Sequence, residues 1–182
     1  MMIWLALVAH LFSAHTGTRQ DWVEADVATK RLPPAAFPSL PVAVRKDLER
    51  RGCTVPQSFA ATRAGNVARG RFTSATATDW AVLCSVERVS TILVFRGGSV
   101  PASAELGRYP DSNFLQVIDG RGLIGYSRAI AVANARVIRE HNRDNPDLPR
   151  LDHDGIDDIF VEKGSSIWYW YRGGWRELWG AD

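Results

Sequence analysis

Two blocks of β-forming sequence constrain the fold of this chain more than any other feature. The first holds the apolar run WAVLC (residues 80–84), the turn SVER and the run VSTILVF (89–95). The second holds DIFVEK (158–163), SSIWYWY (165–171), the turn RGG and WRELWG (175–180). Runs rich in β-branched and aromatic residues, bounded by turn residues, predict strands joined as hairpins. A hairpin with one apolar face is only marginally stable alone, so we expect the two blocks to pack together or to join one sheet.

A short helix is predicted before the first block. Apolar residues recur at four-residue spacing over residues 40–48, which is typical of an amphipathic helix. Ser39 suits its N-cap, Pro41 its first turn and Gly52 the position after its end.

A third hairpin and a second helix are predicted in the middle of the chain. FLQVI (114–118), the turn DGRG and LIGYSRAI (123–130) form a hairpin pattern, and AVANARVIREH (131–141) has helical composition. Residues 101–111 are predicted to be a loop. The predicted fold class is α+β and β-rich, with an antiparallel sheet built from two related strand–hairpin units and two short helices.

The N-terminal segment MMIWLALVAHLFSAHTG (residues 1–17) indicates export. Its apolar run has the length of a signal-peptide core and small residues follow it, although no Lys or Arg precedes it; the alternative is a buried strand or helix. The run is too short to span a bilayer as a mature anchor. We therefore expect a signal peptide at 1–17, an extended proline-rich arm at 18–41 and a single β-rich domain at 42–182. The protein is expected to be secreted or periplasmic.

The chain has two cysteines, Cys53 and Cys84. In an oxidising compartment an even pair predicts a disulfide, which would stabilise the fold by about 3–4 kcal/mol for a loop of this size. The alternative is a pair of buried free thiols that act as small apolar side chains.

The two β blocks also share a sequence pattern. RFTSATATDWAV aligns with RLDHDGIDDIFV, and VFRGG aligns with WYRGG in the same order. This alignment matches Asp79 with Asp158, each before a strand, where a carboxylate can accept backbone N–H bonds across its own loop. The pattern indicates duplication of a strand–hairpin unit.

The stretch LDHDGIDD (151–158) places aspartates around a glycine, directly before the apolar run IFV. Calcium prefers oxygen ligands at alternating loop positions, with a glycine at the sharp turn. The stretch resembles the loop-plus-strand of FG-GAP or VCBS-type repeats, which occur in secreted and cell-surface proteins and often bind calcium in β-propeller blades. The resemblance implies Asp152, Asp154 and Asp158 as side-chain ligands of calcium, and Ile156 as a backbone carbonyl ligand.

Two alternatives for this stretch stay open. Arg150 stands where the family has its first ligand, and a guanidinium cannot coordinate a cation. A cation-free Asp-Gly turn, with the aspartates bonded to the backbone and Arg150 as counter-charge, is therefore the first alternative. A transition metal held with His153 is the second.

The block SSIWYWYRGGWRELW is dense in aromatic residues. On a strand, Trp168 and Trp170 face one side while Tyr169 and Tyr171 face the other. We identify Trp168 and Trp170 as candidate ligand-binding residues that could stack on sugar rings or a peptide. The alternative is that both faces are covered by core.

No established catalytic motif is present, and a net charge of +2 without a basic patch argues against a nucleic-acid partner. The sequence therefore favours a non-enzymatic binding or structural module for an unknown protein or glycan, with calcium as the expected ion. The alternative is a small secreted hydrolase that uses His141 or His153 with nearby aspartates.

Overall fold

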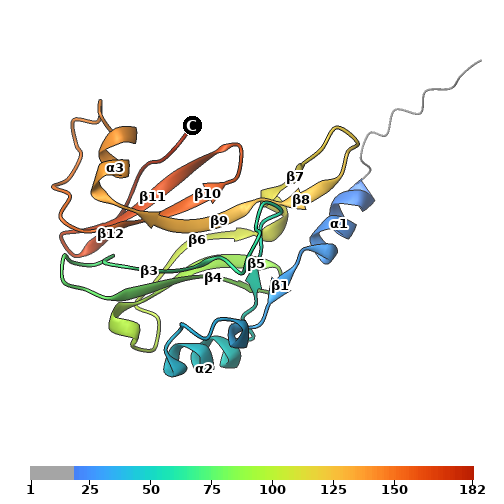
Figure 1. The fold of residues 1–182 in the computed structure, drawn as a ribbon, viewed down its shortest axis with the longest axis horizontal. Coiled ribbons are helices and arrows are strands. Elements are labelled where there is room, and N and C mark those ends of the chain that lie inside the picture. The colour runs from blue at the N-terminus through green and yellow to red at the C-terminus, as the bar shows by residue number, and fades with distance from the viewer. Residues whose placement is uncertain (1–18) are drawn as a thin grey trace, which may run out of the picture.

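The fold is α+β and rich in antiparallel β-structure. The computed structural model describes residues 19–182, so the expected signal peptide at 1–17 lies outside the described residues. Two four-stranded sheets form two layers, and two short two-stranded sheets lie beside them (Figure 1). Within residues 19–182, no helix is both long and apolar enough to cross a membrane.

The first β block lies in a sheet whose strand order follows the chain. Its strands are β3 (Val67–Gly70), β4 (Asp79–Val86), β5 (Val89–Phe95) and β6 (Ala104–Pro110). Glu87 and Arg88 make the β4–β5 turn with φ of 50° and 62°, the left-handed backbone that matches strand twist in tight hairpins. The prediction of a loop at 101–111 is wrong over β6, which pairs with β5 on both sides of a bulge.

The second β block lies in a separate sheet, again in chain order. Its strands are β9 (Arg128–Ala133), β10 (Gly155–Phe160), β11 (Gly164–Tyr171) and β12 (Gly174–Trp179). Arg172 and Gly173, both at positive φ, make the predicted β11–β12 turn. Residues 131–133 continue β9, so the second predicted helix is shorter than expected.

The two sheets pack face to face over a shared apolar core. The first sheet contributes residues such as Leu83 and Ile92, and the second contributes Ile130 and Ile156. The Asn66 side chain joins the sheets at one edge: its amide accepts a hydrogen bond from Ile130 N–H (3.0 Å) and donates one to the Arg128 carbonyl (3.3 Å). These two backbone groups lie on the edge of β9 away from β10, and Asn66 satisfies them in place of a neighbouring strand.

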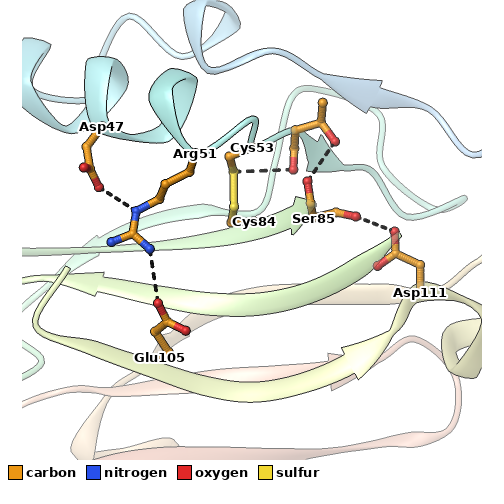
Figure 2. The surroundings of a disulfide bond; sticks show 8 residues. Asp47, Arg51, Cys53, Cys84, Ser85, Glu105 and Asp111 are labelled. Carbon is orange, nitrogen blue, oxygen red and sulfur yellow. Dashed lines mark hydrogen bonds and ion pairs between the residues drawn. A yellow bond between two sulfur atoms is a disulfide. The ribbon is translucent and has the colours of Figure 1, made fainter. Parts of the chain in front are cut away.

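The outer face of the first sheet is covered by α2 (Val42–Arg50) and the proline-rich segment before it. The predicted Cys53–Cys84 disulfide is confirmed and ties the end of α2 to β4. Figure 2 shows Arg51 beside it, bonded to Asp47 in α2 and to Glu105 in β6. Gly52 takes the expected left-handed conformation after the helix (φ 69°). The N-cap is Pro41 rather than Ser39, without a side-chain hydrogen bond.

The outer face of the second sheet is covered by α3 (Ala135–His141). The Asn134 side chain caps this helix by accepting bonds from the N–H groups of Arg136 and Val137. At the other end, the buried Asn142 side chain accepts a bond from Trp179 N–H (3.2 Å) and donates one to the Trp179 carbonyl (2.8 Å). Asn142 thus pairs with the outer edge of β12 as a further strand would.

The segment 18–41 is not an extended arm throughout, because α1 (Arg19–Ala28) occupies its first part. Its Val23 and Val27 are exposed, so no apolar stripe marks this helix in the sequence. The short elements are β1 (Arg31–Leu32), β2 (Val55–Pro56), β7 (Leu115–Val117), β8 (Ile124–Tyr126), and the 3-10 turns η1 (Pro34–Ala36), η2 (Arg96–Gly98) and η3 (Asp111–Phe114). α1 packs against the β7–β8 hairpin, which projects away from the two layers (Figure 1).

Candidate functional site

The side chains of the acidic stretch 151–158 do not converge. Asp154 accepts hydrogen bonds from the Arg71 backbone N–H (3.0 Å) and from its guanidinium, 83 residues away in the chain. Asp158 pairs with a different arginine, Arg128. Asp152 is exposed and lies within hydrogen-bond distance of the Tyr169 hydroxyl (3.4 Å).

The expected calcium ligands are therefore bonded to cationic or polar groups of the protein. Ile156 is a fully buried core residue in β10, a strand paired on both sides. In the described part of the chain, no three His, Cys, Asp or Glu residues gather in a group able to hold a metal ion. Arg71 and Arg128 supply the counter-charges. The predicted counter-charge Arg150 is exposed and forms no ion pair with a described residue; its backbone carbonyl accepts from the Tyr169 hydroxyl.

The two histidines named for the hydrolase alternative are used differently. His153 is buried and stacks on the Tyr169 ring at a centroid distance of 4.3 Å. Its Nδ1 lies 3.0 Å from the Asp154 carbonyl and its Nε2 lies 3.8 Å from Asp152. His141 lies in the last turn of α3; burial raises the pKa of the nearby Asp157 carboxyl, and His141 offsets part of that rise. The hydrolase alternative stays a prediction.

Asp79 and Asp158, which the repeat hypothesis aligns, have different partners. Asp79 accepts hydrogen bonds from the backbone N–H groups of Thr73 (2.9 Å) and Gly97 (3.0 Å), so it holds its own loop as predicted. Asp158 binds the Arg128 guanidinium instead. Duplication of the unit stays a prediction.

A groove of about 330 Å³ opens beside Asp158 between the two sheets. Four aromatic side chains line it: Tyr109, Phe114, Phe160 and Trp168. The Phe114 ring is the centre of this cluster, with centroid distances of 6.0 Å to Tyr109 and 5.5 Å to Phe160. We call this feature the aromatic groove.

The floor of the aromatic groove is the ion pair between Arg128 in β9 and Asp158 in β10. The Arg128 side chain is fully buried, and Asp158 accepts from its Nε and Nη2, each at 2.8 Å. The remaining Arg128 donors bond to the Ser90 carbonyl and hydroxyl and to the Gly107 carbonyl. These bonds use all five N–H donors of a guanidinium. The guanidinium also lies 4.6 Å from the Phe114 ring centroid, a cation–π contact.

Gly107 makes this arrangement sterically feasible. It lies at the β6 bulge with φ of 53°, and a Cβ atom there would come within 2.7 Å of Arg128 Nη2 and 2.9 Å of Asp158 Oδ2. Only a glycine can approach the pair this closely and aim its carbonyl at Arg128.

A buried hydroxyl pair extends the polar interior away from the groove. The Tyr126 hydroxyl lies 3.5 Å from the Ser90 hydroxyl, which accepts from Arg128. Burial, and then the nearby Asp111 carboxylate, raise the pKa of Tyr126 well above its ordinary value. Tyr126 is therefore neutral, and it belongs to the packed interior.

The rim of the aromatic groove is polar and balanced in charge. Lys163 and Glu177 are exposed there, and neither forms an ion pair with any residue in the described range. Ser165 and Ser166 also line the groove, and the Ser165 hydroxyl accepts a hydrogen bond from Ala181 N–H (2.8 Å). Opposite charges at the rim and a neutral pair at the floor give the groove no preference for a charged ligand.

Of the two tryptophans predicted to bind ligand, the structure places one in the groove. Trp168 lines it, and its indole Nε1 is buried without a hydrogen-bond partner in the described range. Trp170 lies outside the groove, with the Arg96 guanidinium 4.0 Å from its ring centroid and Trp175 packed edge-on at 5.6 Å. On the other face of β11, Tyr169 and Tyr171 pack toward α3. Both faces of β11 are therefore largely covered, which is the alternative to ligand binding by these tryptophans.

Sequence reasoning missed the other three aromatic residues of the groove. Tyr109 lies in a segment predicted to be a loop, and Phe114 and Phe160 fall in runs read as ordinary strand. The available signal was the presence of single large aromatics at strand ends, which does not reveal that three distant segments meet.

Comparisons with known proteins found no match to the chain among protein-family models, curated proteins or solved structures. The resemblance to FG-GAP or VCBS-type repeats therefore rests on the sequence motif alone and stays a prediction.

Proposed function

We propose that this chain is a non-enzymatic binding module that takes a saccharide ring in the aromatic groove. The observation that carries the proposal is the combination of four aromatic side chains with a carboxylate that is fixed from below. Aromatic rings pack on the apolar faces of sugars, while a few oriented polar groups select their hydroxyls.

Asp158 is suited to bind hydroxyl groups. Each of its oxygens accepts one hydrogen bond from Arg128, and a carboxylate oxygen has room for a second donor. Because the carboxylate is locked in place by two bonds, it need not be ordered when a ligand binds. A volume of about 330 Å³ is at the lower end of the range for small-molecule sites, which fits one or two sugar rings.

The charge of the site supports an uncharged ligand. Arg128 neutralises Asp158, and Lys163 and Glu177 have opposite signs. The proposal includes export, because a disulfide such as Cys53–Cys84 persists in oxidising compartments, where extracellular glycans are found.

An array of immobilised neutral mono- and disaccharides, followed by calorimetric titration of the best binder, tests the proposal. Tyr109→Ala removes an exposed groove ring and should weaken binding about tenfold, the equivalent of about 1.4 kcal/mol. Trp179→Ala is the matched control, because this aromatic is 61% exposed and lies outside the groove. Absence of any saccharide binding at millimolar concentration, or equal loss in both variants, would overturn the proposal.

A further inference from the structure

A second cavity of about 410 Å³ lies between α1, residues 57–64 and the β7–β8 hairpin. It lies apart from the aromatic groove and shares no lining residue with it. Two backbone hydrogen bonds fix the 57–64 segment as its wall: Gln57 N–H donates to the Lys30 carbonyl (2.8 Å) and Phe59 N–H donates to the Tyr126 carbonyl (2.7 Å). The cavity is therefore a built feature of the fold. We call it the α1 pocket.

The walls of the α1 pocket are mainly apolar. Ala25 and Ala28 line it from α1, Phe59 from the loop, and Ile118 and Leu123 from the β7–β8 hairpin. Leu123, at the tip of that hairpin, is 58% exposed. An apolar cavity with an exposed leucine beside it is suited to an apolar ligand body.

The polar side chains of these walls are mostly bonded within the protein. The Gln57 side chain bonds to three backbone carbonyls and accepts from Gly65 N–H. The Thr29 hydroxyl donates to the Ala25 carbonyl (3.0 Å). The Tyr126 hydroxyl lies against Ser90. None of these side chains needs a ligand to satisfy it.

Two cations at the edge of the pocket have no charged partner among the described residues. Lys30 and Arg63 both line the α1 pocket and are exposed, and neither forms an ion pair with any residue of the 19–182 range. Among residues 19–182, no aspartate or glutamate lines the pocket. An apolar cavity edged by two unpaired positive charges is complementary to a ligand with one anionic end and one apolar end.

We infer that the α1 pocket binds a free medium-chain carboxylic acid. The alkyl chain lies among Ala28, Phe59 and Ile118, and the carboxylate lies at the Lys30 and Arg63 end. Arg63 can bind a carboxylate with two parallel hydrogen bonds, which a lysine alone cannot do. This site requires neither the aromatic groove nor saccharide binding.

Calorimetric titration with decanoate, below its micelle-forming concentration, tests the inference. Decyltrimethylammonium is the probe of equal chain length and opposite charge. Decanoate should bind and the cationic probe should bind at least about tenfold more weakly, a difference of about 1.4 kcal/mol or more. Equal binding of the two probes would overturn the inference, because charge would then play no part.

Variants locate the site. Arg63→Glu and Lys30→Glu should each weaken decanoate binding about tenfold. Lys46→Glu, which reverses an exposed lysine of α2 without an ion pair in the described range, should leave it unchanged. Ala28→Trp keeps both charges and fills the cavity, so it should abolish binding; unchanged binding in this variant would overturn the assignment of the pocket. Co-flotation with phosphatidylglycerol vesicles without decanoate binding would likewise overturn it, in favour of a membrane surface as the partner.

Discussion

Arg128→Met tests the interior of this fold most directly. The arginine is fully buried and donates all of its hydrogen bonds within the protein. Methionine is similar in length but has no donor, so Asp158, with a side chain only 9% exposed, would lose its counter-charge. Removing one partner of a buried ion pair costs about 3–5 kcal/mol. We expect a loss of about 4 kcal/mol, a large share of the about 5–15 kcal/mol that stabilises a typical domain.

Urea denaturation followed by circular dichroism at neutral pH measures this loss by linear extrapolation. Asp158→Asn breaks the pair from the other side, because it leaves the fully buried Arg128 without a counter-charge; we expect a loss in the same range of about 3–5 kcal/mol. The double variant Arg128→Met/Asp158→Leu leaves neither charge in the interior. It should regain about half of the loss caused by Arg128→Met, because no unpaired charge remains buried.

Arg139→Met is the control, since this exposed arginine of α3 forms no ion pair in the described range and should change stability by less than about 0.5 kcal/mol. A loss below about 1 kcal/mol for Arg128→Met would refute the reasoning, because that is the value of a surface pair. So would a double variant less stable than the single one.

Three further predictions concern other parts of the chain. Replacing Cys53 and Cys84 by serine removes a link across 31 residues and should lower the free energy of unfolding by about 3–4 kcal/mol. Urea denaturation measures this loss, and a reductant should destabilise the parent protein but not the variant. Asp157→Asn should stabilise the protein at neutral pH, because burial raises the pKa of the Asp157 carboxyl and penalises its charged form. The stability gained by Asp157→Asn should shrink as the pH falls through the pKa of Asp157 in the folded protein, and it should vanish below the unfolded value of 3.8. Thermal melts of both proteins across acidic pH measure this, and a gain that does not change with pH would contradict the prediction. Calcium should leave the melting temperature unchanged relative to excess chelator, because Arg71 already pairs with Asp154; a calcium-dependent rise that Asp154→Ala abolishes would instead establish a metal site.

Local signals in the sequence predicted the local parts of the structure. Turn residues and β-forming runs predicted the turn at Arg172 and Gly173, the left-handed Gly52 after α2, and the β4–β5 and β11–β12 hairpins. The disulfide followed from an even pair of cysteines and an expected oxidising compartment. Each of these features depends on a few residues that are close in the chain, or on a pairing with only one solution.

Features that depend on distant contacts were not predictable in this way. Arg71 and Asp154 are 83 residues apart, and nothing near either residue identifies the other as its partner. Residues 101–111 were predicted to be a loop, and their Gly107 is a residue that strands usually avoid, whereas here it makes the bulge beside Arg128. The acidic stretch was read as a unit because its aspartates are adjacent in sequence. Asp152 and Asp154 lie before β10, and Asp154 and Asp158 bind different arginines, Arg71 and Arg128, so their shared chemistry is not assembled.

The two asparagines that pair with strand edges have a consequence for how the molecule behaves at high concentration. A free strand edge offers hydrogen-bonding groups to any other chain, which makes it a starting point for aggregation. A carboxamide presents an N–H donor beside a C=O acceptor, as a strand edge does, so Asn66 and Asn142 can occupy the edges of β9 and β12. The Nδ2 group of each also donates within the protein, to the Pro56 carbonyl from Asn66 and to the Ile138 carbonyl from Asn142, so neither side chain offers a new edge of its own. At these two points the second sheet ends in a side chain, and another chain cannot extend it.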